Sequence, residues 1–177
     1  MTTQPFTLYH LPAVAESNKP LDCLEELISY PIASSNRIAA ITTEPINVVM
    51  MLEQAHHPKA GGIVLFSGEV RDHHAGKDVV YLVYEAHVLL AEKMIGEIVR
   101  TAKERWNLSH VAAVHRIGKL EISESAVVVV TSHAHRKQAY EANQYIIDRI
   151  KHEAPIWKCE HYADGSYEWS KGCLDKF

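Results

Sequence analysis

Four consecutive valines, Val127–Val130, constrain the fold of this chain more than any other feature. A run that is apolar at every position is typical of a strand buried on both faces of a sheet. The predicted strand covers Ala126–Ser132, and a short His/Arg segment connects it to a helical pattern over Lys137–Glu153. The apolar residues of that helix recur at helical spacing: Ala139, Ala142, Ile146 and Ile150. These patterns predict helices packed on a sheet.

The other segments between residues 41 and 169 alternate in the same way. Runs of apolar, β-branched and aromatic residues predict further strands at Ile63–Val70, Val79–Glu85, Val111–Ile117, Ile156–Tyr162 and Tyr167–Trp169. A helix is predicted from Pro45 to about His56. A second, long helix is predicted from an apolar stripe at Leu90, Met94, Ile98 and Ala102.

Turn residues set the limits of these elements. The segment Arg71–Asp78 is polar and predicts a loop, and Pro155 must end the preceding helix near Ala154. The Asp164-Gly165 dipeptide predicts a hairpin turn. We therefore expect an α+β fold, with a mixed sheet, two main helices packed on it and a C-terminal hairpin.

The first residues differ from the rest of the chain. Prolines punctuate the segment 1–36, at Pro5, Pro12, Pro20 and Pro31. The spacing of Leu21, Leu24 and Ile28 allows one short helix there. We expect an N-terminal extension over residues 1–40, followed by one domain over residues 41–177, a size usual for a single domain.

Composition excludes several classes of protein. The 18 basic and 22 acidic residues give a net charge of −4, which argues against a protein that coats nucleic acid. The longest apolar run, Val79–Tyr84, is far too short to cross a membrane. Three cysteines without a Cys-x-x-Cys pair do not form a disulfide framework, so we expect a reducing cytoplasm. Common nucleotide, zinc-protease and serine-hydrolase motifs are absent.

Ser132–Arg136 is the first candidate site. The predicted strand ends here and a helix begins, so that backbone N–H groups and the cationic side chains of His135 and Arg136 lie near a helix N-terminus. Such a segment can bind a phosphate or a carboxylate. The alternative is that Ser132 caps the helix and that the two basic side chains are solvated.

Lys151 and Lys158 form the second candidate site. Lys151 lies in the last turn of the predicted helix, and Lys158 lies on the next strand, on the face opposite Trp157 and Cys159. Two lysines that approach each other lower one pKa, which creates a base or an amine nucleophile. The alternative is that both lysines are solvated, as lysines at helix ends and edge strands usually are.

Three further features carry weaker signals. Gly68 allows a close approach to the backbone, and Arg71 can grip an anion or pair with a nearby carboxylate. The 12 histidines include adjacent pairs, but no organised set of three or four ligands is present, so we expect no metal. Nothing near Cys159 marks its thiol as an activated sulfur carrier.

Five segments, in order and at matching spacing, resemble the large catalytic subunit of molybdopterin synthase, the MoaE family. They are Gly62–Arg71, Leu82–His87, Val114–Gly118, Ser132–Arg136 and Ala154–Glu160. The resemblance covers about Ile41–Trp169, and its most specific part is the His-Arg pair before a helix that ends in Lys-x-x-x-Pro-x-Trp-Lys.

The resemblance implies an α/β hammerhead fold and a cytoplasmic sulfurtransferase. Members of the family form the dithiolene of molybdopterin from cyclic pyranopterin monophosphate, a step of molybdenum cofactor biosynthesis. The sulfur comes from the thiocarboxylated C-terminal glycine of a ubiquitin-like small subunit of the MoaD type. Two large subunits dimerise, with one small subunit at each end of the heterotetramer, and no cofactor or metal is implied.

The resemblance also implies roles for individual residues. It places Lys151 beside the incoming tail and makes Lys158 the second essential lysine, so both are expected to be catalytic. Substrate binding is assigned to these two lysines and to Glu69, Val70, Arg71, His135, Arg136, Cys159 and Glu160. The C-terminal Arg of the family has no clear counterpart, and Lys171 is a doubtful substitute.

Two alternatives from other classes remain open on the sequence. One is a non-catalytic scaffold that binds the C-terminal tail of a ubiquitin-like protein, and it predicts a complex without turnover. The other is a metal hydrolase that uses the histidines, and it predicts stoichiometric metal in active protein.

Overall fold

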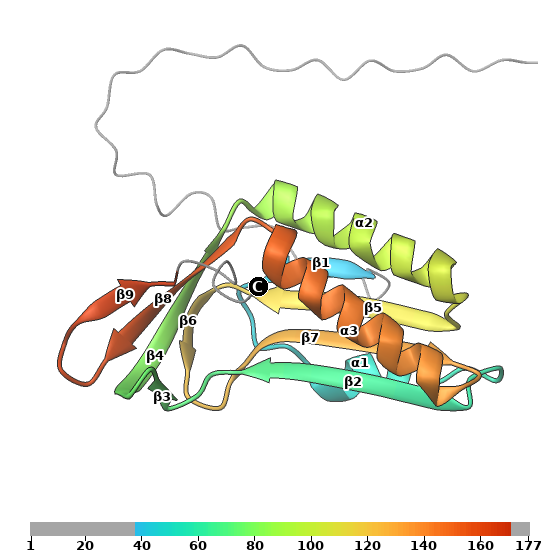
Figure 1. Cartoon of the computed structure of the whole chain (residues 1–177), viewed down its shortest axis with the longest axis horizontal. Coiled ribbons are helices and arrows are strands. Elements are labelled where there is room, and N and C mark those ends of the chain that lie inside the picture. Colours follow the sequence, from blue (N-terminus) through green and yellow to red (C-terminus); the bar gives the residue numbers. More distant parts are fainter. Residues whose placement is uncertain (1–37, 171–177) are drawn as a thin grey trace, which may run out of the picture. The chain divides into compact units, whose positions relative to one another are not determined.

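The computed structural model describes residues 38–170, so most of the expected N-terminal extension, its short helix and Lys171 lie outside the described residues. The elements follow one another as drawn in Figure 1. In chain order they are β1 (Ala39–Thr42), α1 (Val48–Gln54), β2 (Gly62–Glu69), β3 (His73–His74), β4 (Lys77–Ala86), α2 (Val88–Trp106), β5 (His110–Arg116), β6 (Gly118–Glu121), β7 (Ser125–His133), α3 (Arg136–Glu153), β8 (Ile156–Tyr162) and β9 (Tyr167–Trp169).

The first sheet has four strands in the order β1-β5-β7-β2. Strand β1 is parallel to β5, and the other pairs are antiparallel, so the sheet is mixed as predicted. The four valines of β7 are buried and alternate between two cores. Val127 and Val129 pack with α2 and α3, and Val128 and Val130 pack with Met51 of α1. Because both faces of β7 are covered, every position of the run is apolar.

A second sheet corrects the expectation of a single one. Its strands have the order β3-β4-β8-β9, and β6 also pairs with β4. Strand β6 was not predicted, because Leu120 is its only apolar side chain. Gly118 has φ +90 and directs the chain from β5 of the first sheet into β6 of the second. The expected loop Arg71–Asp78 contains β3 and the start of β4.

The two long helices lie on the same face of the first sheet (Figure 1). In α3 the predicted apolar stripe is confirmed, because all four of its residues are buried. In α2 the stripe is rotated by about one residue: Leu90 is 42% exposed, and the buried residues are Ala91, Ile95, Ile98, Val99 and Ala102. The prediction weighted large side chains, whereas two alanines let the helix approach its neighbours closely.

Asn143 attaches α3 to the sheet. The side chain is buried, and its Nδ2 donates hydrogen bonds to the carbonyl oxygens of Val64 in β2 at 3.2 Å and of Val129 in β7 at 3.0 Å. The hydroxyl of Thr131 donates to the carbonyl of Ala139 at 2.9 Å, so the same helix face is fixed at a second point. These polar contacts define the position of α3 along the sheet.

We predict that Asn143→Ala lowers the free energy of unfolding by about 2 kcal/mol, because buried hydrogen bonds are lost and a small void is left. The exposed neighbour Gln144 is the matched control, and Gln144→Ala should change stability by less than about 0.5 kcal/mol. Urea unfolding monitored by circular dichroism measures both values. Equal stability of the two variants would contradict the role given to Asn143.

Candidate active site at the junction of the two sheets

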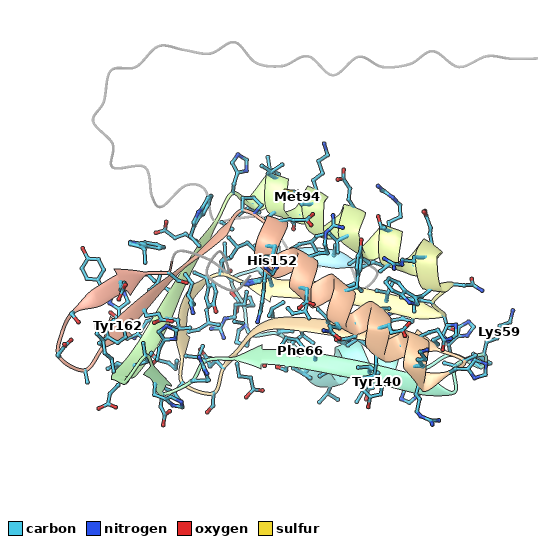
Figure 2. All side chains as sticks on the ribbon, in the orientation of Figure 1. Lys59, Phe66, Met94, Tyr140, His152 and Tyr162 are labelled. Atoms are coloured by element: carbon cyan, nitrogen blue, oxygen red, sulfur yellow. The ribbon has the colours of Figure 1, made fainter. Side chains whose placement is uncertain are left out.

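The C-terminal ends of β2, β5 and α3 meet the second sheet at one junction. Val70, directly after β2, packs against Leu82 and Tyr162 of the second sheet. The ring of His115 in β5 lies 5.1 Å from the ring of Tyr84 in β4. Figure 2 shows His152 at the end of α3, Phe66 on β2 below this helix and Tyr162 on β8. Lys151 belongs to the same last turn of α3.

Lys151 lies over an aromatic floor. Its Nζ is 5.7 Å from the centre of the Phe66 ring, a cation–π distance. Gly68 makes room for that ring, because a Cβ at this position would lie 2.8 Å from Cγ1 of Val127 and 3.3 Å from Cε1 of Phe66. Lys151 and Phe66 also belong to a groove of about 430 Å³ between β2 and α3. The lysine thus stands at one border of a hollow with a partly apolar lining.

Lys158 has a different environment. Its Nζ lies 2.7 Å from Oε1 of Glu160, and the hydroxyl of Tyr162 donates to Oε2 of the same carboxylate at 2.8 Å. Nδ1 of His74 lies 3.7 Å from Oε1. Burial opposes ionisation of Glu160, but the hydrogen bonds from Lys158 and Tyr162 outweigh it and hold the pKa of the carboxyl below its ordinary value. Lys158 is therefore an ion-paired lysine.

Two neutral rings separate the lysines. Tyr84 lies directly opposite Lys158 across β4 and β8, and burial together with the charge of Glu160 raises the pKa of its phenol to about 12. Burial lowers the pKa of His115 to about 4, and the positive charge of Lys151 adds to the lowering. The hydrogen bond from Nδ1 to the carbonyl of Arg116 acts in the opposite direction and raises this pKa. At neutral pH both rings are uncharged.

The remaining predicted residues divide into two groups. Glu69 and Arg71 are exposed at the end of β2, on either side of buried Val70, and so belong to the junction. Cys159 lies on the opposite face of β8 from Lys158, as predicted, and pairs in register with Val83 and Trp169. Burial and nearby carboxylates raise the pKa of its thiol, which keeps the sulfur protonated.

His135 and Arg136 are not at this junction within one chain. His135 precedes the first turn of α3, Arg136 opens it, and Lys151 lies in the last turn. At 1.5 Å per residue, the ends of this helix are about 22 Å apart. Arg136 lies instead beside Gly62 at the start of β2. A single chain therefore presents two separate cationic sites.

Sequence reasoning missed His115 and Tyr84 as members of the site. A usable signal existed for His115, because it continues the face of β5 that carries buried Val111 and Ala113 toward the helices. A histidine at a position that the strand pattern reserves for an apolar side chain indicates a special environment. Tyr84 gave no such signal, since aromatic residues are usual in strands.

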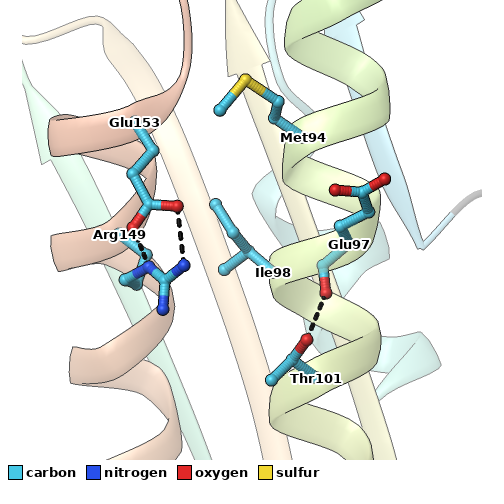
Figure 3. A pocket seen from close by; sticks show the side chains of 6 residues that line it. All are labelled: Met94, Glu97, Ile98, Thr101, Arg149 and Glu153. Carbon is cyan, nitrogen blue, oxygen red and sulfur yellow. Dashed lines mark hydrogen bonds and ion pairs between the residues drawn. The ribbon is translucent and has the colours of Figure 1, made fainter.

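The other features of residues 38–170 do not form a comparable candidate site. A hollow of about 150 Å³ lies between α2 and α3. The guanidinium of Arg149 pairs there with Glu153 and is thus already neutralised (Figure 3). No group of three or more metal-ligating side chains is present among these residues. None of the helices in this part of the chain is long and apolar enough to span a membrane.

The two packed sheets, the helix pair on one face and the groove bordered by Lys151 define an α+β protein. Residues 41–153 match the family model described as MoaE protein. The chain belongs to the MoaE family.

Named relatives agree with this assignment. The molybdopterin synthase catalytic subunit of Halalkalibacterium halodurans is 47% identical over 126 residues, which are 71% of this chain and 81% of the relative. That of Bacillus subtilis is 44% identical over 129 residues, covering 73% and 82%. The crystal structure of molybdopterin synthase from Staphylococcus aureus is similar with a TM-score of 0.72 at 39% identity, covering 76% of this chain and 98% of that one.

We predict that His115 makes stability sensitive to acid. The pKa is about 4 in the folded protein against an ordinary 6.5, so the unfolded chain binds the proton more tightly and stability falls as the pH drops below 6.5. Between pH 7.5 and 4.5 the free energy of unfolding of the wild type should fall by roughly 2–3 kcal/mol relative to His115→Asn. Urea unfolding of both proteins at the two pH values measures this, and parallel pH profiles would contradict it.

Proposed function

We propose that this chain is the catalytic subunit of a molybdopterin synthase. In this role it transfers sulfur from the thiocarboxylated C-terminal glycine of a ubiquitin-like small subunit to cyclic pyranopterin monophosphate. The observation that carries the proposal is Lys151, whose ammonium lies over Phe66 with no acidic partner found among residues 38–170. Membership of the MoaE family and relatives that are named catalytic subunits support it.

The electrostatics of the junction suit this reaction. Both the pterin phosphate and the thiocarboxylate are anions, and an ammonium without an acidic partner stabilises them and the negative charge that develops during transfer. The thiocarboxylate sulfur bonds to a pterin side-chain carbon as that carbon loses an oxygen substituent, and water then cleaves the bond between the sulfur and the partner's acyl carbon, so that the partner's terminus leaves as a carboxylate. Lys158 already balances Glu160, so we assign it to orientation and proton transfer and the principal charge stabilisation to Lys151.

The groove between β2 and α3 suggests how the partner's tail reaches Lys151. It is bordered by Val64, Phe66 and Tyr140 and also includes Lys151. An extended chain terminus without bulky side chains fits such a narrow hollow. We expect the reaction to take place in the cytoplasm, where the family acts.

We further propose that each complete site combines two copies of the chain. His135 and Arg136 match the substrate-binding pair of the family, yet they begin the helix that ends at Lys151. In a twofold dimer, the start of α3 from one copy can lie beside the end of α3 from the other. The separation within one chain and the dimer that the family resemblance implies support this arrangement.

We predict that Lys151→Ala lowers molybdopterin formation by about 100-fold or more, since the ammonium that has no acidic partner among residues 38–170 is removed. The assay mixes purified protein with a thiocarboxylated small subunit and cyclic pyranopterin monophosphate. Lys93→Ala on the exposed surface of α2 is the control and should keep full activity. Unchanged activity of Lys151→Ala would remove this lysine from the mechanism, and a wild-type complex without turnover would favour the scaffold alternative.

Mixing of variants tests the two-copy site. Arg136→Ala and Lys151→Ala should each be inactive alone, because every site lacks one group. After co-refolding of equal amounts, about a quarter of wild-type activity should return, since about half of the dimers are mixed and each holds one intact site. A mixture as inactive as its components would place both residues in a site made by one chain.

A further inference from the structure

His115 occupies an unusual place for an imidazole. It lies at the end of β5, on the face that packs under α2 and α3, and is only 7% exposed. In the sheet it is directly opposite Val127, which in turn is opposite Gly68, so the three residues form one row. Directly opposite residues share a face, so His115 lies on the same floor as Phe66, over which Lys151 is placed.

One hydrogen bond fixes the tautomer of His115. Nδ1 lies 2.8 Å from the carbonyl oxygen of Arg116. A carbonyl only accepts, so Nδ1 carries the proton and donates it. Because the ring is neutral, Nε2 then bears a lone pair and acts only as an acceptor. The ring orientation is fixed as well, since the edge contact with Tyr84 restricts its rotation.

The lone pair of Nε2 accepts no hydrogen bond within the described residues. No hydrogen-bond donor to it is found among residues 38–170, yet it does not belong to the sealed, unpartnered polar atoms, which include Nε2 of His110. Two polar neighbours act on the imidazole: the ring of Tyr84, whose centre is 5.1 Å away, and the ammonium of Lys151 through its charge. The acceptor thus belongs to the sheet face that carries Phe66, over which Lys151, a nearby side chain with three N–H donors, is placed.

We propose that His115 is a positioning residue for Lys151: its Nε2 accepts a hydrogen bond from the ammonium and holds it above the pocket floor, facing the site of sulfur transfer. The proposal rests on the function proposed above. His115 does not act as a base, since a neutral ring that resists protonation cannot take the proton of a lysine. Its contribution is orientation, which is valuable because small misplacements of a charged group are costly in rate.

Two substitutions separate positioning from structure. His115→Asn keeps a donor near the place of Nδ1 but removes the acceptor at Nε2, whereas His115→Gln places an amide oxygen near Nε2. We expect His115→Asn to lower kcat by about 10- to 100-fold with little change in KM, and His115→Gln to recover a substantial part of the loss. His110→Asn, the same change at the other end of β5, is the control and should keep wild-type kcat.

A second readout does not depend on turnover. In protein with ¹⁵N-labelled lysine, a hydrogen-bonded ammonium exchanges its protons slowly, so the Lys151 signal should be visible in the wild type and in His115→Gln and weakened in His115→Asn. Lys151→Ala assigns the signal.

Two results would overturn the proposal that His115 positions Lys151. Wild-type kcat and proton exchange in His115→Asn would overturn the proposal. Equal losses of kcat in both variants, in step with their melting temperatures, would overturn it too, because they would indicate a purely structural histidine. If the wild type itself makes no molybdopterin, the proposed function fails, and the exchange measurement still decides whether His115 holds Lys151.

Discussion

The burial of β7 on both faces is the constraint on which the rest of the structure depends. Its alternating valines need cover from two sides, and α1 provides one side while α2 and α3 provide the other. Helix α3 therefore has to run along the sheet from the end of β7 to the junction with the second sheet. The hydrogen bonds of Asn143 to two neighbouring strands then fix the position of α3 along the sheet. The position of Lys151 follows from this packing.

The two lysines are chemically unequal although the sequence presents them as a pair. Lys158 is held by a buried carboxylate that a tyrosine hydroxyl also binds, so its charge is balanced within the fold. Lys151 lies over an aromatic ring, and the imidazole on which its charge acts is neutral. Lys151 therefore keeps a charge that no acidic side chain of residues 38–170 balances, which suits the reaction between two anions that we propose. The buried acid keeps the neighbouring strand from adding a second uncompensated cation.

Much of this architecture could be predicted from sequence, because strong patterns mark it. The valines of β7, the stripe of α3, the stop at Pro155 and the turn at Asp164-Gly165 were all confirmed. Weak patterns were missed: β1 and β6 are four residues long, and their pairing depends on partners distant in the chain. The second sheet, to which β6 belongs, was therefore not expected.

The candidate site shows the same limit in chemical terms. Residue types and spacing selected the lysines and the His-Arg pair, but they could not show that Glu160 neutralises one lysine. The predicted helix already implied that Arg136 and Lys151 lie at opposite ends of α3, although the two were assigned to one pocket. The contact with Glu160 depends on side-chain placement in the second sheet, which the sequence pattern did not reveal. His115 was hidden in an otherwise ordinary strand, and its importance follows from one carbonyl and one open nitrogen.

The length of α3 carries a consequence for how such a chain can change over time. If its two ends serve two different sites of one assembly, the length of the helix fixes the distance between the groups that it contributes to those sites. A single inserted or deleted residue would rotate one end by about 100° and shift it by about 1.5 Å relative to the other. Loops elsewhere can grow or shrink without such penalties, so variation in length should accumulate around α3 and spare its interior.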